Sequence, residues 1–475
     1  MIYLRFDAGS LVLGGLDKLW EERLAPWVVA DPRIAAHRAS AHHYAQILRL
    51  LHGNCSYDDQ ARAYATLELR ERGRQPLRPY QSQALEAWQA AKRRGVIVLP
   101  TGSGKTYVAV KAILECRRSA LILAPTIDLV QQWALDLELR LGCAIGRYGG
   151  GDRVLAEITV ATYDSGILIT PHHGNRFGLL ICDECHHLPA GATAFCAEGN
   201  LAPFRLGLTA TPERSDGGHQ RLDELLGPIV HRSQITELEG RYLANYHVEV
   251  LEVPLDPDEA EDYQRHRATY LDFVRALGIR FDAPDGWQRF LSEAARAPGG
   301  REVLRAWREQ RRIARGSRAK LRLVWQLLRD HHHERVIIFT DDNATAYAIG
   351  AQMLLPVLTH HSKPSERKAM LAAFRSGDWP VLVTSRVLNE GVDVPEAAVG
   401  IVVSGTGSVR EHVQRLGRIL RPGPDKVAQL YELISADTAE AHTSARRRNH
   451  IAFDGEMEMD FTPGDGQGMD EDGQP

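Results

Sequence analysis

Two series of short apolar runs, each run separated from the next by a helix-like stretch, constrain the fold of this chain most strongly. Runs of Val, Ile and Leu without polar alternation are typical of strands buried on both faces. Such strands, alternating with helices, form parallel sheets covered by helices. The first series comprises residues 96–100, 120–125, 158–162, 179–184 and 205–212, and the second comprises 335–340, 381–385, 400–404 and 430–434. The sequence therefore predicts an α/β protein with two parallel-sheet domains.

Three further regions flank these two units. Residues 1–76 contain short strand-like and helical pieces without a recognisable motif. Residues 255–325 are poor in strands and rich in Arg, Glu and aromatic residues, which predicts a helical insertion. Residues 451–475 are Gly-rich and acidic, which predicts a disordered tail. We therefore expect five parts, at residues 1–76, 77–254, 255–325, 326–450 and 451–475.

Length and composition favour a large cytoplasmic protein. The 475 residues correspond to about three domains of roughly 150 residues each. No run approaches the roughly 18 apolar residues that a membrane span needs, so we expect no membrane association. The N-terminus lacks the basic lead-in of a signal peptide. The six cysteines have no regular spacing, which fits a reducing compartment.

The net charge of −4 hides an uneven distribution. Residues 451–475 carry eight acidic residues and no Lys or Arg, which leaves about +4 on residues 1–450. The most basic segment is 301–322, where nine cations face only Glu302 and Glu309. Such a segment attracts polyanions, although it can equally be a solvated helix face. Both interpretations stay open on charge alone.

The strongest local motif is LPTGSGKT at residues 99–106. It places a Gly-rich turn between a strand and a helix that we expect to begin at about Thr106. Gly residues let backbone N–H groups approach phosphate oxygens closely, a Lys adds positive charge, and a Thr hydroxyl can bind Mg²⁺. Leu99 stands where the full pattern has Gly, so the match is strict only at its GKT end. The motif predicts an ATP site formed by Thr101, Gly102, Ser103, Gly104, Lys105 and Thr106.

A second motif, LLICDECHH at residues 179–187, delivers two carboxylates to the end of a strand. Ligands of open parallel sheets bind at the carboxyl ends of strands. We expect Asp183 to bind Mg²⁺ through water. We expect Glu184 to orient and deprotonate the water that attacks the γ-phosphate.

Cysteine and histidine pairs elsewhere do not predict a metal site. Cys182 and Cys185 form a C-x-x-C, but Cys182 ends a buried strand and no second such pair follows. We expect the His pairs at 42–43, 172–173, 186–187 and 360–361, and the triple at 331–333, to lie in loops and on surfaces. Adjacent residues of a regular element do not face one site.

GSGKT followed by DECH and then LTATP (208–212) resembles the superfamily 2 helicases, whose motor consists of two RecA-like domains. Further motifs follow in the order of that superfamily. LRPYQ (77–81) resembles its adenine-reading motif, with Arg78 and with Gln81 able to bond both edges of the base. APTIDLVQQW (124–133) and ATYDSG (161–166) resemble motifs that track the DNA strand. TSRVLNEGVDVP (384–395) and QRLGRILR (414–421) resemble motifs V and VI of the second domain. The resemblance covers about residues 77–435.

Within this superfamily the chain is most similar to the xeroderma pigmentosum group B branch. That branch includes compact archaeal and bacterial DNA repair helicases that move 3′→5′. It has a small N-terminal damage-recognition domain and a helical thumb between the motor domains, at positions that match residues 1–76 and 255–325 here. It also has an Arg-Glu-Asp motif after TATP. Here that stretch is Arg214-Ser215-Asp216, without the central carboxylate. The resemblance therefore supports strand separation less strongly than it supports ATP hydrolysis.

The resemblance also implies roles for single residues. Gln414 would sense the nucleotide, while Arg418 and Arg421 would reach the transferred phosphoryl group as arginine fingers. The resemblance implies DNA contact or coupling to the ATP site for Thr126, Thr162, His186, Thr209, Thr211, Arg214, Asp216, Thr384 and Arg386. Gly391 and Asp393 of motif V would join DNA contact to the nucleotide site.

The family resemblance thus implies an ATP- and Mg²⁺-dependent monomeric motor on single-stranded or forked DNA. Three alternatives remain at this point. The first is a translocase without unwinding, such as the motor of a restriction or defence system, with a nuclease partner protein. The second is a catalytically silent nucleic-acid scaffold, which the intact Lys105, Asp183, Glu184, Arg418 and Arg421 disfavour. The third is an RNA substrate, since motor motifs separate DNA from RNA poorly.

Overall fold

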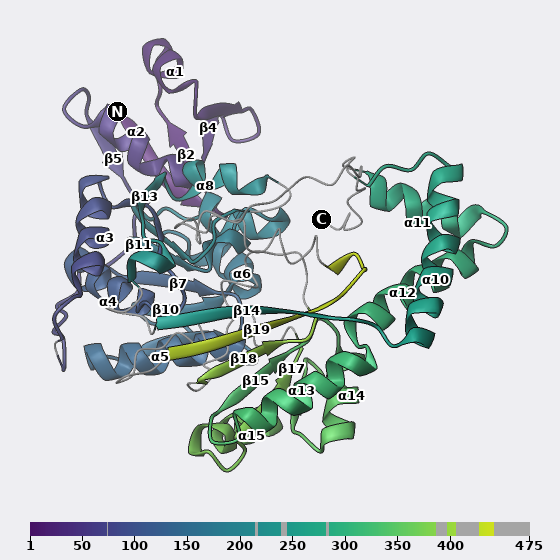
Figure 1. The fold of residues 1–475 in the computed structure, drawn as a ribbon. Helices are drawn as coiled ribbons and strands as arrows, with labels where there is room; N and C mark the ends of the chain where they lie inside the picture. The colour runs from purple at the N-terminus through teal and green to yellow at the C-terminus, as the bar shows by residue number, and fades with distance from the viewer. Residues whose placement is uncertain are drawn as a thin grey trace. The chain divides into compact units, whose positions relative to one another are not determined.

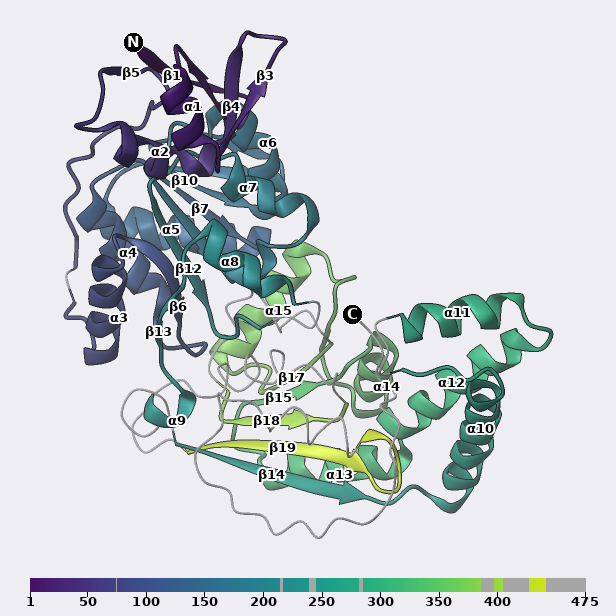
Figure 2. The same cartoon turned by 90° about the horizontal axis from the view of Figure 1, so that it is seen from above.

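The computed structural model describes residues 1–73, 75–213, 217–238, 245–281, 285–385, 397–404 and 427–440. The chain divides into two compact units, one formed mainly by Met1–Ser233 and the other beginning at Gln234 (Figures 1 and 2). Within the described ranges, every helix is too short or too polar to cross a membrane. The predicted disordered tail, 451–475, lies outside the described residues.

The first unit begins with a small domain of one five-stranded sheet in the order β3-β4-β2-β1-β5. All neighbours are antiparallel except β5, which pairs parallel to β1. Its core joins aliphatic residues of the sheet to Trp20 and Tyr44. Its elements are β1 (Ile2–Asp7), β2 (Ser10–Gly14), α1 (Lys18–Leu24), β3 (Val28–Asp31), β4 (Ala36–Ser40), η1 (Ala41–His43), α2 (Tyr44–Leu51) and β5 (Tyr57–Asp59).

The rest of the first unit is an eight-stranded sheet in the order β13-β6-β12-β11-β7-β10-β8-β9. All neighbouring strands are parallel except the pair β8–β9. The strands are β6 (Arg94–Val98), β7 (Ala120–Ala124), β8 (Ile145–Gly149), β9 (Asp152–Val154), β10 (Ile158–Thr162), β11 (Leu179–Asp183), β12 (Phe204–Thr209) and β13 (Ile229–Arg232). Each predicted run of the first series forms one of these strands. The sequence missed β8, β9 and β13, which are less apolar and lie toward the sheet edges.

Helices cover this sheet as expected for buried parallel strands. They are α3 (Pro79–Ala90), α4 (Lys105–Cys116), α5 (Ile127–Leu141), α6 (Tyr163–His173), η2 (Cys185–His187), η3 (Gly191–Ala194), α7 (Phe195–Glu198), η4 (Gly218–Gln220) and α8 (Arg221–Leu225). The helices α4, α5 and α6 begin within a few residues of the carboxyl ends of β6, β7 and β10. Because these strands are parallel, their C-terminal ends lie on one side of the sheet. The N-termini of the three helices and the acidic end of β11 therefore lie together on that side.

The second unit contains a six-stranded parallel sheet in the order β14-β19-β18-β15-β17-β16. Its strands are β14 (Asn245–Val253), β15 (Val336–Phe339), β16 (Val357–Leu358), β17 (Val381–Thr384), β18 (Val399–Val402) and β19 (Val427–Ser435), and its other elements are α9 (Ile235–Leu238), α13 (Arg318–Asp330), α14 (Asn343–Met353) and α15 (Pro364–Ser376). The predicted runs of the second series form β15, β17, β18 and β19. The strand β14 precedes the expected domain boundary at residue 254, and yet it belongs to the sheet of the second unit. It pairs along its whole length with β19, a partner 182 positions later that local sequence does not reveal.

Helices α10 (Pro257–Ala276), α11 (Gly286–Arg296) and α12 (Gly300–Arg315) form the insertion within the second unit (Figure 1). Tyr270, Phe281 and Phe290 are buried, and Trp287 stacks on Trp307 with ring centroids 4.8 Å apart. The insertion aromatics therefore form a small core of their own. This packing accounts for their presence without base stacking.

The nine cations of residues 301–322 are not one uniform face. Arg315 pairs with the buried Asp341 at 2.6 Å, and Arg322 pairs with Asp256 at 2.6 Å. Arg318 contacts Asp256, Asp258 and Glu259. Lys320 is fully buried, where its ammonium donates to the carbonyl of Val403 and to Glu440. These four cations hold α12 and α13 against neighbouring parts of the unit.

The remaining cations lie on α12. Arg301, Arg305, Arg308 and Arg312 are exposed and follow the spacing i, i+4, i+7, i+11. This spacing places them along one face of the helix. Arg311 instead lies over the ring of Trp307, 4.9 Å from its centroid. We call Arg301, Arg305, Arg308 and Arg312 the α12 arginine stripe.

Candidate nucleotide site

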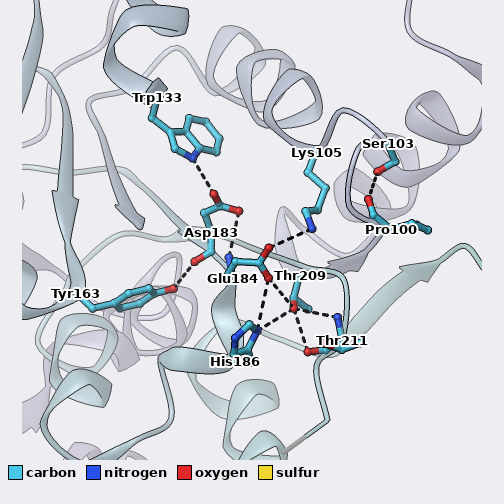
Figure 3. A network of polar contacts seen from close by, with 10 residues as sticks. All are labelled: Pro100, Ser103, Lys105, Trp133, Tyr163, Asp183, Glu184, His186, Thr209 and Thr211. Carbon is cyan, nitrogen blue, oxygen red and sulfur yellow. Dashed lines mark hydrogen bonds and ion pairs between the residues drawn. The ribbon is translucent and has the colours of Figure 1, made fainter. Parts of the chain in front are cut away.

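The turn between β6 and α4 has the backbone geometry of a phosphate cradle. Gly102 and Gly104 adopt φ of +83° and +82°, a region that side-chain-bearing residues rarely occupy. A Cβ at Gly104 would come within 2.6 Å of Nε2 of Gln81. The buried Ser103 donates its hydroxyl proton to the carbonyl of Pro100 at 2.6 Å, which closes the turn (Figure 3). The helix α4 begins at Lys105, so its first N–H groups face this turn.

Two residues of the preceding helix brace the turn. Tyr80 Oη donates to the carbonyl of Ser103 at 2.6 Å, and Nε2 of Gln81 donates to the same carbonyl at 2.8 Å. Oε1 of Gln81 accepts from the backbone N–H of Arg78 at 3.0 Å. Both ends of the Gln81 amide are therefore engaged by the protein. Recognition of the adenine by Arg78 and Gln81 stays a prediction.

The strand β11 places Asp183 and Glu184 beside the turn. Oε1 of Glu184 accepts from Nζ of Lys105 at 3.4 Å, and both side chains are about one-tenth exposed (Figure 3). Glu184 has φ of +46°, which is strained for a residue with a side chain. This conformation turns the chain at the end of the strand and holds adjacent carboxylates in separate positions. Burial, followed by the charge of Glu184, raises the pKa of Asp183.

Two aromatic residues that the sequence analysis did not single out position Asp183. Nε1 of Trp133, on α5, donates to Oδ2 of Asp183 at 2.8 Å, and both residues are buried. Oη of Tyr163, on α6, donates to the backbone carbonyl of Asp183 at 2.8 Å (Figure 3). Both lie in the motifs thought to track DNA, as the last residue of 124–133 and the third residue of 161–166. A buried indole N–H requires an acceptor, and this requirement was the one available sign that Trp133 contacts a polar group.

A polar network continues from Glu184 to the end of β12. Oγ1 of Thr209 lies 3.3 Å from Oε2 of Glu184 and 3.1 Å from Nδ1 of His186. The backbone N–H of Thr211 donates to the same hydroxyl oxygen at 3.2 Å. The structure thus brings Glu184, the expected base, together with His186, Thr209 and Thr211, for which the resemblance implies coupling (Figure 3).

The donor set at this edge fits Mg²⁺ with a nucleotide phosphate. A cavity of about 440 Å³ is lined by Gly104, Thr106 and Trp133, among others. A Thr hydroxyl and a carboxylate are hard oxygen ligands of the type that Mg²⁺ prefers. Oγ1 of Thr101 is buried without a hydrogen bond in the described part of the chain, which leaves it able to bond a ligand at the turn. Thr106 and Asp183 would hold the ion.

The predicted DNA-contacting threonines have different surroundings. Thr126 and Thr162 are N-caps of α5 and α6 and accept from the N–H groups of Leu129 and Ser165. They follow or end the adjacent strands β7 and β10, so two helix N-termini suited to anions lie side by side. Thr384, in contrast, is fully buried, and its hydroxyl donates to the carbonyl of Ser385. Contact of Thr384 with a DNA phosphate stays a prediction.

Several predicted site residues lie outside the described residues. They are Arg214, Asp216, Arg386, Gly391, Asp393, Gln414, Arg418 and Arg421. Their roles stay predictions from sequence.

The structure shows the surroundings of the cysteines and of two of the histidines. Among the described residues, no group of three or more Cys, His, Asp or Glu side chains is placed to bind a metal. Cys182, Cys185 and Cys196 are buried core residues, and burial raises the pKa of each thiol. His42 and His186 are also buried, so the expectation that the His pairs lie on surfaces is wrong for these two. Both are held by tertiary contacts that adjacent residues do not reveal.

Three family models match successive parts of the chain. Residues 4–61 match the xeroderma pigmentosum group B helicase damage recognition domain. Residues 74–214 match the type III restriction enzyme, res subunit. Residues 305–457 match the ERCC3/RAD25/XPB C-terminal helicase.

Curated relatives carry the same family names. The "DNA 3'-5' translocase XPB2" of Sulfurisphaera tokodaii is 43% identical over 372 residues, which cover 78% of this chain and 84% of the relative. The "DNA 3'-5' helicase XPB" proteins of Kineococcus radiotolerans and Mycobacterium tuberculosis are each 31% identical over 80% of this chain. The chain spans only 63% and 64% of these two bacterial relatives.

Solved structures support the fold alone. The Pyrococcus furiosus Hef helicase domain has a TM-score of 0.51 at 20% identity, covering 78% of this chain and 98% of that chain. Saccharomyces cerevisiae Dbp5 bound to RNA and ADP BeF3 has a TM-score of 0.54 at 16% identity, covering 80% of this chain and 88% of that chain. Together with the N-terminal and C-terminal family matches and the archaeal relative, the two parallel-sheet units show that the chain belongs to the XPB family of superfamily 2 DNA helicases and translocases.

Proposed function

We propose that this protein is an ATP-hydrolysing motor that moves 3′→5′ along DNA, opens duplexes and acts in DNA repair. The observation that carries the proposal is the polar network joining Lys105, Glu184 and Thr209 beside the phosphate cradle. The names of the relatives support the choice of DNA and of polarity. Single-stranded or forked DNA is the substrate we expect for a monomeric motor of this kind.

ATP hydrolysis would use the described residues as follows. Backbone N–H groups of residues 102–106 and the ammonium of Lys105 bind the phosphates and stabilise their charge. Glu184 accepts the proton of the attacking water and orients it. When bound by Thr106 and Asp183, Mg²⁺ neutralises charge on the β- and γ-phosphates. Trp133 holds Asp183 in the orientation that this binding needs.

Coupling to DNA would use the same sheet edge. Trp133 and Tyr163 contact Asp183 from α5 and α6, whose N-caps are Thr126 and Thr162. A phosphate bound at those helix N-termini would therefore be linked through each helix to the residue that binds Mg²⁺. Arg418 and Arg421 would complete the site from the second unit, as arginine fingers do.

Translocation without unwinding is the second candidate. Arg214-Ser215-Asp216 lacks the central carboxylate of the family motif, and the archaeal relative is named a translocase, not a helicase. Strand separation needs a device beyond the motor that moves the chain along DNA. The two candidate functions therefore share the ATP site and differ in one measurable activity, the separation of duplex strands.

ATPase assays with and without single-stranded DNA test the motor. We expect DNA to stimulate turnover, and we expect Lys105→Ala and Glu184→Gln to abolish it. Glu184→Gln should still bind ATP, because the change removes the base and leaves the cradle intact. Glu86→Gln, an exposed carboxylate on α3, is the matched control and should behave as wild type. Turnover at the wild-type rate in Glu184→Gln would remove the assignment of the base.

Strand displacement separates the two candidates. The substrates are DNA and RNA duplexes with a 3′ or a 5′ tail, and displacement of streptavidin from biotinylated single strands reports translocation alone. Unwinding of 3′-tailed DNA would support the helicase. Streptavidin displacement without unwinding would support the translocase, and activity confined to RNA would contradict both.

A further inference from the structure

A second cavity lies between the N-terminal domain and the first motor sheet. Its volume is about 570 Å³, within the range of small-molecule sites. Its walls include His42, His43 and Arg49 from η1 and α2, together with Arg94 from β6 and Glu224 from α8. All of these residues belong to the first compact unit.

This cavity is distinct from the nucleotide site. Arg94 is the first residue of β6, whereas the phosphate cradle follows the last residue, Val98. At about 3.3 Å per residue, the two ends of this strand are roughly 13 Å apart. The cavity therefore lies at the N-terminal end of β6, and the cradle lies at the C-terminal end of the same strand.

Three polar atoms on the cavity wall are buried without a hydrogen bond to any described residue. They are Nη1 of Arg94, Nε2 of His42 and Nδ1 of His43. The nearest carboxylate oxygen to Nε2 of His42 is Oε1 of Glu224 at 3.5 Å. A buried polar group without a partner costs about 1–3 kcal/mol. Nη1 of Arg94 and Nδ1 of His43, which have no such contact, indicate a site that is completed by a polar ligand.

The charges on this wall favour an anion with several acceptor oxygens. Burial and the neighbouring Arg49 guanidinium lower the pKa of Arg94 to about 10. An anion between the two guanidinium groups would relieve their repulsion, and the planar guanidinium matches the oxygens of a phosphate. Lys92 at the rim adds a third cation. Burial, followed by the charge of Arg205, lowers the pKa of His42 to about 3, so this ring is neutral and adds no positive charge to the wall.

The remaining walls suit a nucleobase. The ring of Trp27 lies 6.3 Å from that of His43, which offers aromatic surface for stacking. Asp223 and Glu224 also line the cavity, and their carboxylates can accept from base N–H groups. A simple inorganic anion would face these carboxylates without compensation. A ligand with a phosphate at one end and a base at the other satisfies both walls.

We propose that this cavity is a second nucleotide-binding site, in which Arg49 and Arg94 bind a phosphate and Trp27 stacks on a base. The phosphate has two sources, a nucleotide of a DNA strand or a free mononucleotide. The proposal does not depend on the ATPase, because no residue of the cavity belongs to the catalytic network.

The test compares Arg49→Gln/Arg94→Gln with the control Arg5→Gln/Arg23→Gln in the full chain. The control residues are exposed arginines of the same domain that do not line the cavity. Calorimetric titrations with 5′-phosphorylated thymidine dinucleotide, AMP and inorganic phosphate are run without any other nucleotide, and the difference between the cavity variant and the control isolates the second site, because both variants keep the first site intact. We expect at least a tenfold loss of nucleotide affinity in the cavity variant and in Trp27→Leu. The control should bind as wild type does.

The outcomes separate the two sources and the two sites. Binding of the dinucleotide alone assigns the site to DNA, and equal binding of AMP assigns it to a free nucleotide. Equal affinities of the cavity variant and the control for both nucleotides would overturn the proposal, and so would inorganic phosphate binding as tightly as a nucleotide. DNA-stimulated ATPase is measured in the same preparations, so loss of the motor function is recognised separately. If the double variant fails to fold, Arg49→Gln alone gives the same test, because Arg49 is exposed.

Discussion

Glu184 occupies a left-handed backbone conformation, and this one residue shows how the site is held. Such a conformation costs about 1–3 kcal/mol and persists only where surrounding contacts determine it. Lys105, Thr209 and His186 supply those contacts on the carboxylate. The strained backbone conformation of Glu184 therefore helps to hold its carboxylate apart from that of Asp183.

Trp133→Phe tests the hydrogen bond that positions Asp183. The change keeps an aromatic ring and removes the N–H donor, so Asp183 loses a partner worth about 1.5–3 kcal/mol. We expect kcat to fall about tenfold and the Mg²⁺ concentration for half-maximal rate to rise. Gln131→Ala, at an exposed site on the same helix that does not line the cavity, is the control. An unchanged Mg²⁺ requirement in Trp133→Phe would exclude this role for the indole.

His42→Gln tests a pH-dependent contribution to stability. The pKa of His42 is about 3 in the folded protein against 6.5 for an ordinary histidine, so the unfolded chain binds a proton that the folded chain does not. This contribution is complete above pH 6.5 and is lost as the pH falls toward 3, by at most about 1.4 kcal/mol per pH unit. Thermal unfolding at pH 7.5 and 5.5 measures it.

We expect the melting temperature of His42→Gln to fall less between these two pH values than that of wild type. The exposed His52 lies in the same domain, and His52→Gln should keep the wild-type pH dependence. Identical pH dependence of His42→Gln and wild type would show that burial does not hold His42 neutral.

At the scale of elements, α12 carries two kinds of arginine. Arg315 at its end forms an ion pair with the buried Asp341, whereas the α12 arginine stripe is exposed along one face. Reversal of the stripe to Glu should weaken DNA binding and leave the DNA-independent ATPase unchanged. The slope of log affinity against log salt should become shallower by about 0.7 for each lost single-strand phosphate contact. Binding measured over a salt series gives this slope.

The control for the stripe reverses Arg265, Arg275, Arg289 and Arg296, which are exposed arginines on α10 and α11. It changes the net charge of the insertion by the same amount. An equal salt slope in the two quadruple variants would mean that overall charge, and not the α12 stripe, attracts DNA.

At the scale of the whole molecule, the family resemblance predicts that motif VI completes the ATP site. The first unit supplies the cradle, Lys105 and Glu184, and the sequence places Arg418 in the second. Arg418→Ala should retain ATP affinity and lose DNA-stimulated turnover, because an arginine finger contributes about 10³–10⁵ in rate. Single-turnover kinetics beside nucleotide binding measure the two effects. Near-normal turnover at saturating DNA would show that another residue completes the site.

Most of the first motor sheet and the core of its nucleotide site could be predicted from the sequence. The strands that were found are continuous apolar runs, and Lys105, Asp183 and Glu184 lie in short motifs of fixed spacing. Edge strands such as β9 are exposed and carry no such pattern. Trp133 went unrecognised because its acceptor, Asp183, is 50 positions away.

Short-range chemistry thus settled the α/β class, the phosphate cradle and the acidic pair, because strand burial and phosphate binding depend on residues close in sequence. Long-range packing settled the rest. It divided the basic segment into residues such as Arg315, which pair with other elements, and a stripe exposed along one face of α12. It placed β14 in the second sheet, and it brought His42 and Arg94 together at a cavity between two domains. Each of these features depends on partners that the chain brings together only when it folds, and no local pattern encodes such partners.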